Sequence, residues 1–436
     1  MLTFLILMSI LKRSFSFECD KGITMHIYSP KSADDKTKRF FQPLGEGSFG
    51  KVVAFYAEER NLTKDKQINL FIDENDLDKN KTYVKIAIKL LKPSNEQTKW
   101  NDFNEYVYTK HTETQMTELE QEAYMLQKVN KISKEIAPMF YRCGVLDNGH
   151  QFLAMEEVGE NLQDLIHPSH PLNISHKTHV YFKIFSNLRS LHREKTAHCD
   201  IKPSNMSFSG KDKLIKLLDF EFTTTDMPCT GGTLGYIAPE VYQNERYLSV
   251  DGRYSDIYSL GIMLWDIEDY YEGNILTANV LFNRLKLDHS TLKIAMDKIS
   301  NKSLKNLRHI NQGDSFVDFY IDLLKVLHIL FRFMVNPDPY NRPGIERLTS
   351  LVFATHKLLQ MVTKERNKDP DYLFYATNKL SRIAKLTTYE DIYDNFSHLM
   401  TVSKNWDALK EKLYQDSDTR NTSTKPTQGI KPRVYI

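Results

Sequence analysis

Apolar and polar positions follow two different periods along the chain. Between residues 37 and 160, short runs alternate in the manner of β-strands, with a single helical pattern near 115–130. Between residues 175 and 360, apolar residues recur at helical spacing, with brief strand-like pieces near 205–220. The pattern predicts an α+β architecture, in which a small β-rich lobe precedes a larger helical lobe and the two join near Met155–Gly159.

Three of the predicted helices have a clear apolar face. The faces consist of Val180, Ile184, Leu188 and Leu191; of Ile257, Leu260, Leu264 and Ile267; and of Phe316, Tyr320, Leu323, Leu324, Leu327 and Phe331. The third face is wide enough to predict a largely buried helix. Two polar stretches, Glu58–Lys81 and Pro93–Thr114, carry many charges and no sustained period, so we expect them to be surface insertions.

These patterns divide the chain into four segments. Residues 1–36 form an apolar segment and lead-in, 37–355 a two-lobed domain (37–155 and 160–355), 356–415 a helical extension and 416–436 a tail. The tail is rich in Thr, Lys and Pro without apolar periodicity, which predicts disorder.

The helical extension has its own start signal and apolar face. Thr387–Glu390 is a capping-box pattern, and an apolar face follows that consists of Tyr389, Ile392, Tyr393, Phe396, Leu399 and Met400. We expect this face to dock on the large lobe. The alternative is a helix that binds a partner or inhibits its own domain.

The N-terminal apolar run leaves the compartment open. Leu2–Leu11 is followed by Ser14-Phe15-Ser16, which resembles a signal-peptide cleavage site, although Lys12 and Arg13 lie on the wrong side of the run. The run is shorter than the roughly 20 residues that a membrane span needs, so no stable span is predicted. Entry into the secretory pathway and a cytoplasmic location both remain open.

Composition narrows the class of protein. The chain has 436 residues, of which 41% are hydrophobic and 26% charged, and a formal net charge of +2, as in ordinary globular proteins. Such a balanced charge argues against a nucleic-acid binder that depends on contacts to the phosphate backbone, since such a protein needs a concentrated basic stripe. The four cysteines form no CxxC pair, so we expect buried or free thiols rather than a metal site or disulfides.

A glycine-rich motif begins at Leu44 and continues as Gly45-Glu46-Gly47-Ser48-Phe49-Gly50. Glycines at this spacing let backbone amides approach phosphate oxygens closely. Dinucleotide-binding folds use the same spacing, but there a helix follows the glycines. Here the apolar run Val52–Tyr56 reads as a strand, which favours a β-hairpin.

Four further motifs follow in a fixed order. They are Ala87-Ile88-Lys89, His198-Cys199-Asp200-Ile201-Lys202-Pro203-Ser204-Asn205, Asp219-Phe220-Glu221 and Ala238-Pro239-Glu240. Together with the glycine-rich motif they resemble the protein kinase family over about residues 40–355. The resemblance implies a two-lobed kinase fold and transfer of the γ-phosphoryl group of ATP, with Mg²⁺ or alternatively Mn²⁺, to a Ser or Thr hydroxyl of a protein substrate.

The resemblance also assigns roles to single residues. Lys89 bonds the α- and β-phosphates and pairs with a helix glutamate, for which Glu118, Glu120 and Glu122 are the candidates. We choose Glu122, because Leu126 and Val129 follow it in the apolar register of that helix.

In the same way, Asp200 is the catalytic base and Lys202 stabilises charge on the transferred group, while Asn205 and Asp219 hold the metal. Lys202 and Thr233 are typical of Ser/Thr kinases. Arg342 and Asp256 have structural roles by the same resemblance, Arg342 as the buried partner of Glu240 and Asp256 as the anchor of the catalytic loop.

The nucleotide would lie between the glycine-rich motif and the segment that joins the lobes. The residues assigned to it are Leu44, Gly45, Glu46, Gly47, Ser48, Phe49, Gly50, Val52, Ala87, Lys89, Met155, Glu156, Val158 and Ser207. By the same resemblance, Met155 is the gatekeeper residue. The stretch that runs through Gly159 and Leu162 is faintly similar to the casein-kinase-one branch of the family.

The sequence departs from the family pattern at three positions, of which Glu221 and Ser207 count against activity. Cys199 replaces an arginine that pairs with a phosphorylated activation loop, which predicts activity independent of such phosphorylation. Glu221 replaces glycine, and Ser207 replaces the leucine below the adenine. Asn205 also begins a glycosylation sequon. The alternative to an active enzyme is therefore a pseudokinase that acts as a nucleotide- or protein-binding scaffold.

Overall fold

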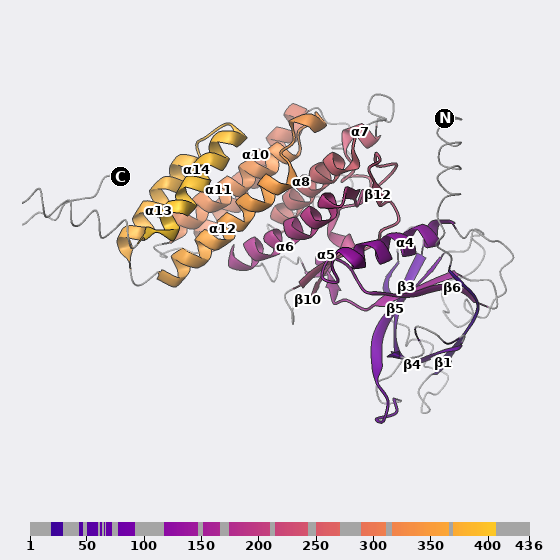
Figure 1. Cartoon of the computed structure of the whole chain (residues 1–436). Helices are drawn as coiled ribbons and strands as arrows, with labels where there is room; N and C mark the ends of the chain where they lie inside the picture. Colours follow the sequence, from indigo (N-terminus) through magenta and orange to yellow (C-terminus); the bar gives the residue numbers. More distant parts are fainter. Residues whose placement is uncertain are drawn as a thin grey trace, which may run out of the picture. The chain divides into compact units, whose positions relative to one another are not determined.

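The computed structural model describes residues 19–28, 43–46, 50–59, 62, 65, 67–71, 77–91, 117–146, 151–165, 174–209, 214–242, 250–270, 289–310, 316–365 and 369–406. The chain forms two compact units (Figure 1). The first unit comprises Met1–Leu162 and Ser204–Thr223, and the second comprises Gln163–Pro203 and Thr224–Ile436. The possible signal segment, the insertion Pro93–Thr114 and the tail lie outside the described residues, apart from Cys19–Tyr28 of the lead-in.

The first unit contains a closed ring of strands. Neighbours around the ring are β3 (Gly50–Glu58), β4 (Gln67–Phe71), β1 (Asp20–Tyr28), β6 (Phe140–Leu146), β7 (Gln151–Glu156) and β5 (Tyr83–Leu91), which pairs with β3 again. The strand β2 (Pro43–Glu46) pairs with the first few residues of β3. The strand β1 runs parallel to both of its neighbours, β4 and β6. Ring closure removes the exposed sheet edges that an open sheet would have.

Alternation along the strands fills the interior of this ring with apolar side chains. The buried cluster consists of Ile23, Met25, Val53, Phe55, Ala57, Leu62, Ile68, Leu70, Ile86, Ile88, Leu90, Phe152 and Ala154. Because side chains alternate between the two faces of a strand, the residues between these positions lie on the outer face of the ring. The residues of β3, β5 and β7 that the sequence predicts to surround a nucleotide include Val52, Lys89, Ala87 and Met155, which lie on this outer face.

Two strands of the ring lie where the sequence predicted none. We expected the lobe to begin at residue 37, yet β1 precedes that boundary and is a full member of the ring. The stretch Glu58–Lys81 was expected to be a surface insertion, but it contains β4, whose Ile68 and Leu70 are fully buried. Only two buried positions alternate in β4, too few to stand out among charged neighbours.

The prediction that the four cysteines are thiols rather than disulfides is also wrong. Cys19 forms a disulfide with Cys143, which joins the start of β1 to β6, and Cys199 forms one with Cys229. No free cysteine remains in the chain. The partners are 124 and 30 residues apart in the sequence, so no local spacing announces either pairing.

Outside the ring, the first unit contains the helix α4 (Thr117–Ile132) and a small sheet. The sheet consists of β8 (Glu160–Asn161), β10 (Met206–Ser209) and β11 (Leu214–Leu217), with β10 in the middle. The hairpin β10–β11 comes from residues that we expected in the large lobe, but its contacts group it with the first unit.

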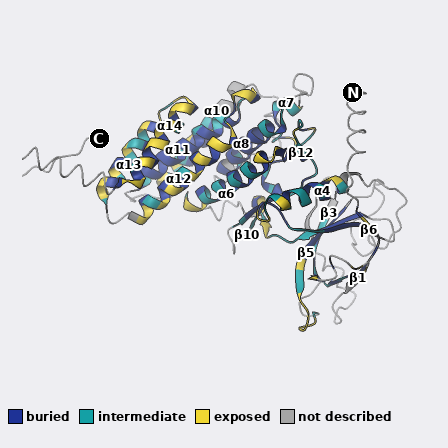
Figure 2. Ribbon diagram, in the orientation of Figure 1, coloured by how far each residue is buried: buried dark blue, intermediate teal, exposed yellow. Residues whose placement is uncertain are grey.

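The second unit is mainly helical. Its elements are α6 (Ile174–Arg193), β9 (Thr196–Ala197), β12 (Thr224–Thr225), α7 (Pro239–Tyr242), α8 (Gly252–Tyr270), α10 (His289–Ile310), α11 (Val317–Met334), η4 (Pro339–Asn341), α12 (Ile345–Glu365), α13 (Pro370–Ile383) and α14 (Tyr389–Lys404), while α5 (Leu162–Leu165) and η3 (Pro203–Asn205) lie at the joins. Every residue of the three predicted apolar faces is buried, and α11 is buried along most of its length (Figure 2). Among the described residues, no helix is long and apolar enough to cross a membrane.

The helical extension packs on the second unit. The helix α12 continues without a break past residue 356, α13 contacts α11, and α14 contacts α12 and α13. The rings of Phe333 and Tyr389 meet edge to face with centroids 5.9 Å apart. The expected docking is therefore confirmed. The cap differs by one residue, because Thr388 accepts from the backbone N–H of Asp391 and Thr387 is not the capping residue.

A histidine between α6 and α12 is held neutral by its surroundings. His356 is 5% exposed, its Nδ1 lies 3.0 Å from Thr178 Oγ1, and its Nε2 lies 2.9 Å from Gln360 Nε2. Burial, helped by the neighbouring positive charges of His179 and Lys357, lowers the pKa of His356 to about 4. The native imidazole thus resists protonation over a range in which an unfolded histidine accepts a proton.

This difference predicts acid-sensitive stability. Below about pH 6.5 the unfolded chain binds a proton at His356 that the native chain does not bind until about pH 4. The free energy of unfolding should therefore fall by about 1–2 kcal/mol between pH 7 and pH 4.5, a value reduced for partial solvent screening. Urea denaturation of the wild type and of His356→Gln measures it. If the free energy of unfolding falls equally with pH in both proteins, the lowered pKa of His356 is not the cause of the acid sensitivity.

Candidate functional site

The glycine-rich motif forms a hairpin, as the sequence predicted. The strands β2 and β3 are antiparallel, with Gly45 opposite Val52 and Glu46 opposite Lys51. Only the backbone is described for Leu44, Gly45, Glu46 and Gly50, whereas Gly47, Ser48 and Phe49 lie outside the described residues. A strand follows the glycines where a dinucleotide-binding fold would have a helix, so that alternative is excluded.

The outer face of β3, β5 and β7 gathers four of the predicted residues. Val52 lies directly opposite Lys89, and Ala87 lies directly opposite Met155. Directly opposed residues share a face, and Ala87 and Lys89 are two apart on one strand. The interior of the ring is occupied by the other side chains of these strands, including Ile86 and Ile88.

Lys89 stands at the centre of a buried charge cluster in the first unit. Its Nζ donates to Glu122 Oε2 at 2.8 Å and to Asp219 Oδ1 at 3.0 Å. Burial disfavours the charge on Lys89, but the two carboxylates outweigh this effect and raise the pKa of the ammonium group above its ordinary value. Of the three candidate glutamates, the structure thus pairs Glu122 with Lys89.

The hairpin β10–β11 brings together two residues that could hold a metal ion. Met206 pairs with Leu217, so Asn205 and Asp219 lie just beyond the same end of the hairpin. The backbone N–H of Leu218 donates to the carbonyl of Asn205 at 2.9 Å, and Asp219 has the left-handed φ of 62°. Amide and carboxylate oxygens are ligands that suit Mg²⁺. The pair therefore fits the predicted ion.

Ser207 bonds the segment where adenine is expected. Its hydroxyl donates to the carbonyl of Val158 at 2.8 Å, and the side chain is only 2% exposed. In the same segment, the carboxylate of Glu156 accepts from Lys216 Nζ at 2.6 Å and from the backbone N–H of Met139 at 2.9 Å. Lys216 was not among the predicted residues, because nothing in the sequence relates it to Glu156, 60 residues earlier.

In the second unit, Asp200 is oriented by two donors. The backbone N–H of Thr233 donates to Oδ1 at 2.8 Å, and Lys202 Nζ donates to Oδ2 at 2.8 Å. Lys202 Nζ also lies 2.6 Å from Thr233 Oγ1, which closes a small network. Asp200 is 3% exposed, so its carboxylate is fixed and largely shielded from water.

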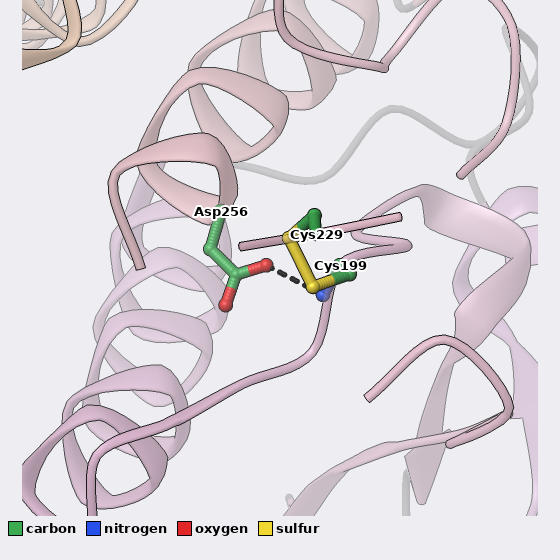
Figure 3. Close-up of side chains that lie close together, drawn as sticks. All are labelled: Cys199, Cys229 and Asp256. Atoms are coloured by element: carbon green, nitrogen blue, oxygen red, sulfur yellow. Dashed lines mark hydrogen bonds between the residues drawn. A yellow bond between two sulfur atoms is a disulfide. The ribbon is translucent and has the colours of Figure 1, made fainter. Parts of the chain in front are cut away.

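Asp256 fixes the backbone just before Asp200. Its two carboxylate oxygens accept from the backbone N–H groups of His198 and Cys199, both at 2.8 Å, and Oδ2 lies 2.9 Å from His192 Nε2. This is the anchoring role expected for Asp256. Figure 3 shows the contact with Cys199 and the disulfide to Cys229 beside it. Because the two sulfurs are bonded to each other, this group offers no thiolate to a metal.

The predicted residues therefore fall into two sets. Lys89, Glu122, Asn205 and Asp219 belong to the first unit, whereas Asp200 and Lys202 belong to the second. Sequence reasoning missed the Cys199–Cys229 link beside Asp200, for which the only signal was a cysteine in place of the usual arginine.

Comparison with known proteins agrees with this geometry. A model of the protein kinase domain matches residues 76–354, more than half of the chain, starting after the glycine-rich hairpin. A membrane-associated tyrosine- and threonine-specific cdc2-inhibitory kinase of Drosophila melanogaster is 26% identical over 221 residues, 49% of this chain and 34% of that protein.

Two relatives from Caenorhabditis elegans are similar over shorter stretches. The mitogen-activated protein kinase kinase kinase mom-4 is 31% identical over 131 residues, 28% of this chain and 24% of that protein. The probable serine/threonine-protein kinase zyg-1 is 31% identical over 149 residues, 32% of this chain and 20% of that protein. The aligned part of the chain thus spans about a third or less of the length of these relatives.

Proposed function

Because the chain belongs to the protein kinase family, we propose that it transfers the γ-phosphoryl group of MgATP to Ser and Thr hydroxyls of protein substrates. Asp200 accepts the hydroxyl proton as the oxygen attacks the γ-phosphorus. The bond to the bridging oxygen then breaks, and ADP leaves with that oxygen. Lys202 stabilises the negative charge on the phosphoryl oxygens in the transition state.

The residues of the first unit would hold the nucleotide. Lys89, kept protonated by Glu122 and Asp219, carries a positive charge suited to the α- and β-phosphates. Asn205 and Asp219 would hold Mg²⁺, which shields the negative charge of the phosphates when bound. The glycine-rich hairpin would cover the phosphates, with Val52, Ala87 and Met155 beside the adenine, Glu156 and Val158 as backbone partners and Ser207 below it.

The observation that carries the proposal is the fixed carboxylate of Asp200. Oδ1 accepts from the backbone N–H of Thr233 and Oδ2 accepts from Lys202 Nζ, so both oxygens of the carboxylate are held in place. The contact of Lys202 with the Thr233 hydroxyl supports Ser/Thr acceptors. One relative is named for tyrosine as well as threonine, so the acceptor needs a direct test.

Purified protein incubated with γ-labelled ATP and Mg²⁺ or Mn²⁺ should label itself or a generic protein acceptor, and Asp200→Asn should not. Acid hydrolysis of the product should give phosphoserine and phosphothreonine. Phosphotyrosine as the main product would overturn the Ser/Thr assignment. Binding of MgATP without any transfer would instead support the scaffold alternative, for which Glu221 in place of glycine is the motivating residue.

The Lys89 cluster gives a second test of the site. Lys89→Met should lower kcat/KM for ATP about 10²-fold or more, because one preorganised positive charge is lost. Lys81→Met is the matched control, since Lys81 also pairs with a glutamate, Glu58, at 3.1 Å but is 40% exposed in its side chain. We expect less than about a twofold change there. Equal effects of the two substitutions would remove Lys89 from the site.

A further inference from the structure

The Cys199–Cys229 disulfide links two segments that both reach the catalytic carboxylate. Cys199 immediately precedes Asp200 in the chain. Cys229 lies four residues before Thr233, whose backbone N–H donates to Asp200 Oδ1. The disulfide, which Figure 3 shows, and this hydrogen bond therefore connect the same two segments at neighbouring points.

The surroundings of the disulfide are shaped to fit it. A Cβ on Gly252 would lie 2.8 Å from Cys229 Sγ and 3.0 Å from Ala197 Cβ, so only glycine leaves room for the sulfur. A Cβ on Gly232 would lie 2.7 Å from the carbonyl oxygen of Cys199, and Gly232 has a φ of 148°. A side chain at Gly252, the first residue of α8, or at Gly232 would therefore clash with the disulfide or with the backbone beside it.

The catalytic loop at Cys199 has an unusual backbone. Cys199 is in the left-handed region with φ 65°, which is uncommon for a residue with a side chain. Asp256 accepts from its backbone N–H, and the disulfide holds its side chain. A backbone held in this conformation aims the next residue, Asp200, and such strain persists only where the surroundings enforce it.

We propose that the Cys199–Cys229 disulfide positions Asp200, so that phosphoryl transfer by this chain requires the oxidised pair and takes place in an oxidising compartment. The inference rests on the proposed kinase function. A dithiol breaks the S–S bond, leaves Cys199 and Cys229 as thiols and is itself oxidised to a disulfide. The segment around Thr233 is then released from its covalent tie, and the carboxylate loses its fixed donor.

Two further observations agree with an oxidising compartment. The second disulfide, Cys19–Cys143, links the start of β1 to the neighbouring strand β6 in the other unit, so all four cysteines are in disulfides. Disulfides of this structural kind persist in secreted and lumenal proteins and are rare in the reducing cytosol. The disulfide holds the segment around Cys229 without a phosphate on the activation loop. This agrees with Cys199 in place of the arginine that pairs with such a phosphate in the family.

The experiment compares the oxidised full-length chain with three altered forms. Dithiothreitol treatment should lower kcat at least tenfold and change KM for ATP less than twofold. Cys199→Ser/Cys229→Ser should have the same low kcat in both redox states. The matched control, Cys19→Ser/Cys143→Ser, should keep the kcat of the oxidised wild type and lose it on reduction. If the buried disulfide resists the dithiol, the Cys199→Ser/Cys229→Ser variant alone decides.

A readout independent of activity separates this inference from the proposed function. Hydrogen exchange should show a protected Thr233 amide in the oxidised protein, and lost protection after reduction or in Cys199→Ser/Cys229→Ser. If the Thr233 amide loses protection when the disulfide is broken, but the protein never transfers phosphate, the disulfide still positions Asp200. The kinase proposal is then wrong. Unchanged kcat, or unchanged Thr233 protection, in the double variant would overturn the inference.

Discussion

Replacing Asp200 by asparagine should lower kcat for phosphoryl transfer by about 10²–10⁴-fold, the usual contribution of a general base. The amide oxygen can still accept the Thr233 N–H, so the local backbone should keep its geometry. What is lost is the proton acceptor and the charge that pairs with Lys202 at 2.8 Å. Initial rates with saturating MgATP and a generic acceptor measure the effect.

Binding and folding controls separate chemistry from structure. The Kd for MgATP should change less than twofold, because the nucleotide residues are assigned to the other unit. Asp318→Asn is the matched control for the substitution itself, since Asp318 has a side chain 73% exposed at the start of α11. A variant at position 200 that keeps a tenth or more of the wild-type rate would show that Asp200 is not the base.

Combining this variant with Lys202→Met adds a further check. Lys202 bonds both Asp200 and Thr233, so the three residues act as one network. Substitutions within such a unit are strongly non-additive, and the double variant should be little slower than Asp200→Asn alone. Additive losses would mean that Lys202 acts independently of Asp200.

Periodic patterns made part of the site predictable. In α4, Leu126 and Val129 are both buried, and Glu122 lies one turn before Leu126 on the same side. A helical period of 3.6 therefore placed one glutamate on the packed face, where it meets Lys89. In β5 the period of two placed Lys89 and Ala87 on one face and Ile88 in the core.

Contacts between residues that are distant in the sequence could not be predicted from periodic patterns. The strand β1 is held by parallel partners, β4 and β6, that are distant in the sequence, and neither period nor turn chemistry specifies such partners. The disulfides depend on where the fold brings Cβ atoms, so their partners follow only from the structure. The bond from the Ser207 hydroxyl to the carbonyl of Val158 likewise joins residues 49 apart in the sequence, and no local pattern relates the two.

Replacing Arg342 by methionine should destabilise the second unit by about 3–5 kcal/mol, because it strands a buried carboxylate. Arg342 and Glu240 are each 4% exposed and form two hydrogen bonds of 2.5 and 2.8 Å. The guanidinium group also donates to the carbonyls of Tyr254 and Asn336, both at 2.8 Å. This pair, which the sequence predicted, therefore ties α7 to the start of α8 and to the segment after α11.

A series of variants tests whether the charge or the geometry matters. Arg342→Lys keeps the charge but cannot form both bonds to Glu240, so we expect an intermediate loss. Adding Glu240→Gln to Arg342→Met removes the stranded charge and should restore part of the free energy of unfolding. Arg347→Met, on the exposed side of α12 with its guanidinium 5.7 Å from the Tyr393 ring, should cost about 1 kcal/mol or less. Urea denaturation measures all four. A loss below about 1 kcal/mol for Arg342→Met would mean that water reaches Glu240 and replaces the arginine.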